Sequence, residues 1–208
     1  GREGRRHASA SAIGPRGGGL SRGIPAMSFS RDISSPARSR HAIPPSGTGP
    51  APACTLVIFG ARGDLTKRLL IPALYNLAGS SLLDADFRVL GVDRVPGTAA
   101  DWRDGLAATM QDFTKDPDGE FYTPTIDQDA WTWVADRLDY VQADFADLGQ
   151  MRALAERVKG NAVFYLAVPS RFFGPLVEML GQAGLVTQQE GTFRRVVIEK
   201  PFGSDLAT

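Results

Sequence analysis

The chain has 208 residues, of which 43% are hydrophobic and 22% charged, an ordinary composition for a globular protein. No stretch approaches the roughly 20 apolar residues that a membrane helix needs, so we expect no membrane association. Cys54 is the only cysteine, which excludes an internal disulfide and suits a reducing compartment such as the cytoplasm.

The net charge of zero conceals an asymmetry between the N-terminal fifty residues and the rest. Residues 1–50 contain eight arginines and two acids, Glu3 and Asp32, a balance of +6 that leaves −6 for the remainder. An acidic folded part argues against a nucleic-acid-binding surface. We therefore predict no nucleic acid among the partners.

Residues 1–53 are rich in glycine, serine, arginine and proline and lack a sustained apolar period. Such a segment cannot bury enough apolar surface to offset its ordering entropy, so we predict a disordered tail before a folded domain at 54–208. Two interpretations of the tail stay open. Its arginine-rich, acid-poor start resembles an organelle transit peptide. Alternatively, the natural protein starts at Met27 or later.

From Thr55 onward, apolar strand patterns alternate with amphipathic helix patterns. The predicted strands are Thr55–Phe59, Phe87–Val92, the weakly patterned Tyr140–Ala143, the strongly patterned Ala162–Val168, and Arg195–Glu199. The first is expected to be buried on both faces, and the last is also expected to be buried. The predicted helices are Asp64–Ala78, a helix capped by Thr98 and Asp101 that runs to about Phe113, Trp131–Arg137, Asp147–Lys159 and Phe172–Ala183. Pro72 falls inside the first helix and should bend it or sit where its missing donor is tolerated.

Strand and helix alternate about five times, which predicts an α/β domain with a doubly wound, mostly parallel, Rossmann-like sheet. Ligands of such sheets bind outside the carboxyl ends of the strands. We therefore expect the functional residues at these ends, which are Gly60–Leu65, Asp93–Arg94, Pro169–Arg171 and Lys200–Gly203.

The turn after the first strand has features of a phosphate-binding turn. Gly60 and Gly63 allow a tight turn in which backbone N–H groups approach a pyrophosphate at a helix N-terminus. Lys67 opposes the helix dipole in the first turn, which a bound phosphate would explain. The G-x-G-x-x-G pattern is incomplete, because Arg62 and Leu65 occupy its second and third glycine positions. An ordinary glycine-mediated β–α turn is the alternative.

Three motifs resemble those of the glucose-6-phosphate dehydrogenase family. Residues 60–68, with Ile71–Leu74, are similar to its GASGDLAKR…xPAL opening motif. Phe164–Pro169 resembles its FYLALPP segment, and Glu199–Gly203 matches its EKPFG motif. The three occur in the family's order within residues 54–208, and together they are far more specific than any one alone.

The resemblance implies an oxidoreductase that transfers a hydride from glucose 6-phosphate to NADP and yields 6-phosphogluconolactone, the first step of the pentose phosphate pathway. It also implies a homo-oligomeric full-length protein without a metal site. Lys200 would contact both the sugar phosphate and the nicotinamide end of the cofactor, and Pro201 would belong to a hinge-like Lys-Pro bond. The implied cofactor-binding residues are Gly60, Ala61, Arg62, Gly63, Asp64, Leu65, Lys67, Arg94 and Lys200.

The chain departs from the family pattern at positions that bear on the cofactor. Arg62 replaces a small residue and would either add a phosphate contact or crowd the turn. Asp93 suits the ribose 2′-hydroxyl of NAD, whereas Arg94 suits the 2′-phosphate of NADP. Ser170 replaces the second proline of the FYLALPP segment. We expect NADP to be preferred and leave NAD use open.

Oxidation of a sugar hydroxyl needs a base, and histidine suits that role near neutral pH. The only histidines are His7 and His41, both in the predicted tail. The resemblance places the base in a later motif, after Thr208, together with a larger substrate domain. We therefore expect a truncated N-terminal portion that is inactive alone. The alternatives are the coenzyme domain of another sugar oxidoreductase, whose strands also end in EKP, or a non-catalytic nucleotide-binding module.

Overall fold

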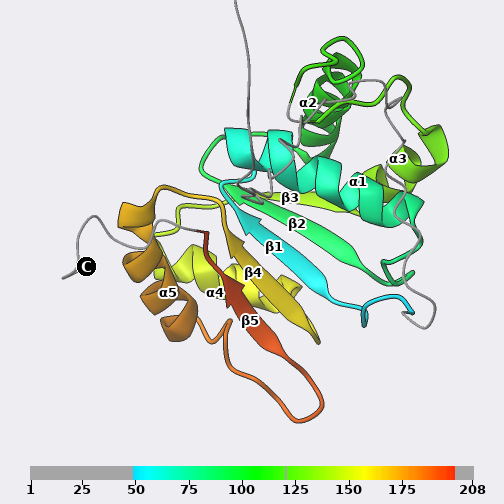
Figure 1. The fold of residues 1–208 in the computed structure, drawn as a ribbon. Coiled ribbons are helices and arrows are strands. Elements are labelled where there is room, and N and C mark those ends of the chain that lie inside the picture. Colours follow the sequence, from blue (N-terminus) through cyan, green and yellow to red (C-terminus); the bar gives the residue numbers. More distant parts are fainter. Residues whose placement is uncertain (1–48, 120, 200–208) are drawn as a thin grey trace, which may run out of the picture. The chain divides into compact units, whose positions relative to one another are not determined.

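A computed structural model describes residues 49–119 and 121–199 (Figure 1). Five strands form one sheet in the order β3-β2-β1-β4-β5, and every neighbouring pair is parallel. The strands are β1 (Thr55–Phe59), β2 (Arg88–Asp93), β3 (Leu138–Gln142), β4 (Ala162–Leu166) and β5 (Arg194–Val197). The chain moves outward from β1 to β3 and then returns to β4 on the other side. This reversal confirms the predicted doubly wound, Rossmann-like α/β fold.

The helices lie on both faces of the sheet, with α1, α2 and α3 over one face and α4 and α5 over the other (Figure 1). A π-helical turn, Thr66–Leu70, leads into α1, and a 3-10 turn, Ser170–Phe172, leads into α5. The helices are α1 (Ile71–Gly79), α2 (Ala99–Asp112), α3 (Gln128–Ala135), α4 (Leu148–Arg157) and α5 (Phe173–Gln182).

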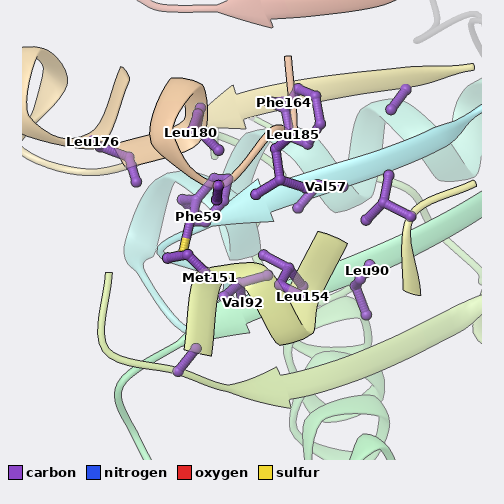
Figure 2. Packing of buried hydrophobic residues seen from close by; sticks show 14 of the residues in the cluster. Val57, Phe59, Leu90, Val92, Met151, Leu154, Phe164, Leu176, Leu180 and Leu185 are labelled. Atoms are coloured by element: carbon purple, nitrogen blue, oxygen red, sulfur yellow. The ribbon is translucent and has the colours of Figure 1, made fainter. Parts of the chain in front are cut away.

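The sheet separates two buried apolar clusters, one on each face. Successive side chains of a strand point to opposite faces, so Val57 and Phe59 of β1 enter one cluster and Ile58 enters the other. Figure 2 shows the first cluster, in which Met151 and Leu154 of α4 pack against β1 and β2. The two-sided burial of β1 confirms the strand pattern predicted from its continuous apolar run.

Pro72 is accommodated by a change in helix type. Helical backbone starts at Asp64, as predicted, but the N–H of Ile71 donates to the carbonyl of Thr66, five residues earlier. Pro72 then occupies one of the first two positions of α1. A proline in a regular helix clashes with the carbonyl four residues earlier. The wider turn directly before Pro72 relieves that clash, as π-turns do where the helical ladder is interrupted.

Two predicted elements need correction. The prediction of a buried fifth strand is wrong: Val196 packs against the first cluster, but Arg195 and Val197 are exposed. The position of β5 in the sheet explains this exposure, because among the described residues β5 is an edge strand with a neighbouring strand on one side only. The helix predicted to start at Trp131 starts earlier, because the Asp127 carboxylate accepts hydrogen bonds from two backbone N–H groups of its first turn.

The predicted tail, residues 1–53, lies mostly outside the described residues. Within the described part, the N–H of Ala51 donates to the carbonyl of Leu82 at 3.0 Å. The side-chain amide of Asn161 donates to the carbonyl of Ala53, also at 3.0 Å. Of the helices in the described ranges, none is long and apolar enough to cross a membrane.

Candidate functional site

A cavity of about 360 Å³ lies at the carboxyl ends of the strands and spans the point where the strand order reverses. Segments that follow β1, β2, β3 and β4 contribute to its walls, and α5 adds an apolar side. The lining residues are Gly60, Gly63, Asp93, Arg94, Asp144, Phe145, Ala146, Ala167, Val168, Pro169, Phe172, Pro175, Leu176 and Met179. The sheet thus places the cavity where open α/β folds bind ligands.

Gly60 makes the turn after β1 sterically feasible. Its φ of +86° is unfavourable for residues with a side chain, and a Cβ there would collide with the carbonyl oxygen of Ala167. The N–H of Gly60 donates to the carbonyl of Val92 at 2.9 Å, while its own carbonyl accepts from Gly63 N–H at 2.9 Å and from the Thr66 hydroxyl at 3.1 Å. The turn is therefore fixed against β2 by a hydrogen bond and lies close to the segment that follows β4.

The turn leaves backbone donors free at the start of its helix. The N–H groups of residues 60–63 all have acceptors within the protein, including the Asp93 carboxylate for Arg62 at 2.9 Å. In the described part of the chain, the N–H groups of Asp64 and Leu65 have no backbone acceptor. These donors lie at the positive end of the helical segment that runs to Gly79, a suitable place for an anion.

The end of β2 combines an engaged carboxylate with a free guanidinium. Asp93 accepts the Arg62 N–H on Oδ2 and the Val95 N–H at 3.2 Å on Oδ1, so both oxygens hold backbone. The side chain of Arg94 is exposed, and within the described ranges it makes no hydrogen bond or ion pair. Asp93 therefore fixes the loop, and Arg94 has a guanidinium available to a bound anion.

Ala61 and Arg62 are predicted site residues that lie at the turn but do not line the cavity. Ala61 is fully buried, and its carbonyl accepts the Trp102 indole N–H at 3.0 Å. The Arg62 side chain turns away to Tyr140, whose hydroxyl accepts from Nε at 3.2 Å. Of the two expectations for Arg62, a phosphate contact or a crowded turn, the described structure shows neither directly.

The remaining predicted residues are Asp64, Leu65, Lys67, Lys200 and Pro201. Asp64 and Leu65 line a hollow of about 240 Å³ beside the first helical turn, where Asp64 lies 3.5 Å from the exposed guanidinium of Arg68. The backbone N–H of Lys67 donates to the carbonyl of Gly63. Lys200 and Pro201 lie outside the described residues.

The end of β5 is tied to β4 by side chains. The Tyr165 hydroxyl donates a hydrogen bond to the carboxylate of Glu199, the residue before Lys200. Burial raises the pKa of Tyr165, and the hydrogen bond to Glu199 raises it further. The hydroxyl therefore stays protonated and remains a donor. This contact connects the segment similar to FYLALPP with the motif that matches EKPFG.

Two parts of the cavity wall were not predicted from the strand ends. Asp144, Phe145 and Ala146 follow β3, and the rule used for the other strands would have found them had that weakly patterned strand been included. The apolar side chains of α5, Leu176 among them, carry no distinct signal, because their spacing is that of an ordinary buried helix face.

A parallel sheet with a glycine turn, free helix-terminal donors and a cavity at the reversal of strand order defines a dinucleotide-binding domain. Residues 57–208 match the family described as glucose-6-phosphate dehydrogenase, NAD binding domain, and the chain belongs to that family. The description of the family supports a nicotinamide cofactor, and the curated relatives that match are named as dehydrogenases, which are oxidoreductases.

The curated relatives include the glucose-6-phosphate 1-dehydrogenase of Chlamydia muridarum (strain MoPn / Nigg), 35% identical over 169 residues, which span 76% of this chain and 32% of the relative. That of Treponema pallidum (strain Nichols) is 36% identical over 165 residues, 78% of this chain and 32% of the relative. The chain therefore spans about a third of the length of these relatives.

Solved structures give the same result. The crystal structure of glucose-6-phosphate 1-dehydrogenase from Mycobacterium avium is similar with a TM-score of 0.63 at 32% identity, covering 75% of this chain and 32% of that one. A glucose-6-phosphate dehydrogenase in complex with its substrate glucose-6-phosphate has a TM-score of 0.57 at 26% identity, covering 74% and 31%.

Proposed function

We propose that this chain is the NADP-binding part of a glucose-6-phosphate dehydrogenase, which oxidises glucose 6-phosphate to 6-phosphogluconolactone as the first step of the pentose phosphate pathway. The observation that carries the proposal is the cavity at four strand ends, with Gly60 and Gly63 at one side and Arg94 beside them. The membership of the chain in the family supplies the reaction.

The residues around the cavity fit a phosphorylated dinucleotide. The free N–H groups of Asp64 and Leu65, which follow the cavity-lining Gly63 in the same turn, would hold the pyrophosphate. The unpaired guanidinium of Arg94 would hold the 2′-phosphate. Each oxygen of Asp93 already accepts a backbone N–H group, so this carboxylate serves to hold the loop, and among the described residues the free cation at this strand end is Arg94. NADP is therefore the proposed cofactor and NAD the weaker one. When bound, NADP supplies the hydride acceptor.

The apolar side of the cavity would receive the rest of the cofactor. Phe172, Leu176 and Met179 come from α5 and its preceding turn, and they would exclude water from that side of a bound cofactor. Lys200 follows the strand end that Tyr165 holds through Glu199, and it would contact the sugar phosphate and the nicotinamide end. We further propose that the full-length protein binds glucose 6-phosphate, forms a homo-oligomer and is located in the cytoplasm.

The chemical step needs a base, histidine suits that role near neutral pH, and residues 54–208 contain no histidine. The 208-residue chain should therefore bind NADP without reducing it. A full-length protein that contains this chain should produce NADPH from glucose 6-phosphate. Measurable NADPH formation by the purified 208-residue chain would overturn the proposed division of roles.

Calorimetric titration of the 208-residue chain with NADP and with NAD tests the binding function. We expect saturable binding of NADP, and weaker binding of NAD. Binding of neither nucleotide would contradict the proposal, and a preference for NAD would contradict the role of Arg94. Activity of the full-length protein on other sugars but not on glucose 6-phosphate would favour another sugar oxidoreductase.

A further inference from the structure

The Arg62 side chain reaches across the end of β2 to Tyr140 on β3, the next strand outward. Its Nε donates to the Tyr140 hydroxyl at 3.2 Å, and its Cζ lies 4.8 Å from the centre of the Tyr140 ring. The hydroxyl in turn donates to the carbonyl of Val95 at 2.5 Å. One hydroxyl therefore joins the glycine turn to the loop after β2.

The loop also encloses the guanidinium. Position 97 is glycine, and any Cβ there would collide with Nη2 of Arg62. Nη2 is buried and has no hydrogen-bond acceptor. An unsatisfied buried donor costs about 1–3 kcal/mol, so an arginine in this place needs a compensating contribution. Within the described residues, no carboxylate lies within ion-pair distance of Arg62.

The loop held in this way carries Arg94 between Asp93 and Val95. The Arg94 side chain has no hydrogen bond or ion pair within the described ranges, so the direction in which it leaves the backbone depends on the backbone of the loop. Asp93 and Val95 fix that backbone on both sides of Arg94, the first through the Arg62 N–H and the second through the Tyr140 hydroxyl. Both attachments lead back to residue 62.

We propose that Arg62 and Tyr140 are positioning residues that determine specificity for a 2′-phosphorylated dinucleotide, by holding the loop so that Arg94 faces the 2′-phosphate. This proposal rests on the proposed NADP-binding function. Arg62 does not line the cavity, so it acts through the loop and not by touching the ligand. A loop ordered in advance binds more tightly because less ordering entropy is lost on binding.

We call the attachment of the loop to Arg62 and Tyr140 the clamp. Titration of the 208-residue chain with NADP and NAD tests the clamp, because the two nucleotides differ only in the 2′-phosphate. Arg62→Ser removes the guanidinium, and Tyr140→Phe keeps both the guanidinium and the ring but removes the bridging hydroxyl. We expect each variant to weaken NADP binding by about three- to tenfold, the scale of one or two hydrogen bonds, with NAD binding unchanged. Arg152→Ser and Tyr122→Phe are matched controls, and neither should change either affinity.

The outcomes separate the clamp from its rivals. A loss of NADP affinity in Arg62→Ser without one in Tyr140→Phe would mean that only the charge matters, and this overturns the clamp. Equal weakening of NADP and NAD would mean a structural role for both residues and also overturns it. If the unmodified chain binds neither nucleotide, the proposed function fails together with the clamp, and no variant is needed to see it.

Discussion

The two sides of the cavity are held in place by different interactions, hydrogen bonds on one side and apolar packing on the other. The polar wall, formed by the Gly60 turn and the end of β2, is fixed by hydrogen bonds that link Gly60, Asp93 and Arg62 to neighbouring backbone. The apolar wall is formed by Phe172 and the inward face of α5. The side chains of α5, Leu176 and Met179 among them, are fixed by packing on the first core cluster. Hydrogen bonds are directional, whereas apolar packing tolerates substitutions that preserve volume.

This difference implies that the two walls play different roles in binding a dinucleotide. The polar wall should decide which phosphates are bound, because it holds the free donors and the unpaired Arg94. The apolar wall should contribute affinity without discrimination, because its side chains present no polar group to the ligand. Changes on the polar wall should therefore alter the ratio of NADP to NAD affinity, and changes on the apolar wall should leave that ratio unchanged.

The largest expected effect comes from Gly60→Ala. A Cβ at position 60 meets the Ala167 carbonyl oxygen, and the φ of +86° adds strain. We expect a loss of at least about 3 kcal/mol in the free energy of unfolding and no detectable binding of either nucleotide. Urea unfolding and calorimetry measure the two effects.

Gly105→Ala is the control for this change. Gly105 lies on the exposed side of α2 with nothing near its Cβ position, so alanine there should raise stability by about 0.5–1 kcal/mol. Wild-type stability and binding in Gly60→Ala would show that the turn does not depend on its glycine.

Arg94→Ser should have the next largest effect and is the sharpest test of the polar wall. A lost hydrogen bond to a charged group is worth about 1.5–3 kcal/mol, so NADP affinity should fall about ten- to a hundredfold. NAD lacks the 2′-phosphate, and its affinity should stay within about twofold of wild type. Stability should be unchanged, because the side chain is exposed. A parallel loss of NAD binding in calorimetry would refute the assignment of Arg94 to the 2′-phosphate.

Met179→Ala tests the apolar wall. Met179 is half-buried on α5 and faces the cavity, so truncation should lower the free energy of unfolding by about 1–2 kcal/mol. The affinities for NADP and NAD should fall together, by about threefold, as apolar contact area is lost. Val177→Ala, an exposed change on the same helix, should leave both affinities unaltered. A selective loss of NADP binding in Met179→Ala would break the division between the walls.

The polar wall could be located from the sequence because its chemistry is local. Gly60, Gly63 and Arg94 stand at strand ends, and strand ends of a parallel sheet meet at one edge, so a list of such residues already approximates the site. The resemblance of the motifs to a known family strengthened the same positions. The direction of the Arg62 side chain was not predictable, because it depends on Tyr140, 78 residues later in the chain.

The apolar wall and the exposure of β5 escaped prediction for a related reason. Leu176 and Met179 have the spacing of a helix that simply packs on a sheet, and only the tertiary position of α5 turns part of that face toward a cavity. The apolar residues of β5 match a buried strand, yet burial depends on neighbours, and β5 has one strand neighbour in the described structure. The local sequence pattern predicts which element forms, whereas the tertiary structure determines which residues of that element are buried, exposed or face a cavity.

The smallest expected effect concerns α2, which begins directly after the loop that follows β2. Asp101 accepts hydrogen bonds from the N–H and the hydroxyl of Thr98, both at 2.8 Å, and the Thr98 hydroxyl accepts from the N–H of Asp101 at 3.1 Å. The bond from the Thr98 backbone is the main cause that lowers the pKa of Asp101. A lowered pKa in the folded state stabilises the fold above the ordinary aspartate pKa of about 3.9, and the contribution is lost as the pH falls through the folded-state value.

Asp101→Asn should therefore be less stable than wild type at pH 6, and the difference should shrink as the pH approaches 3 in urea unfolding. Asp104→Asn, on the same helix and without a hydrogen bond among the described residues, should show no such trend. The loop that ends at Thr98 carries Arg94, so a loosened cap should also lower NADP affinity slightly while leaving NAD affinity alone. If Asp101→Asn changes stability with pH but not the ratio of the two affinities, α2 anchors the fold only, and the polar wall ends before Thr98.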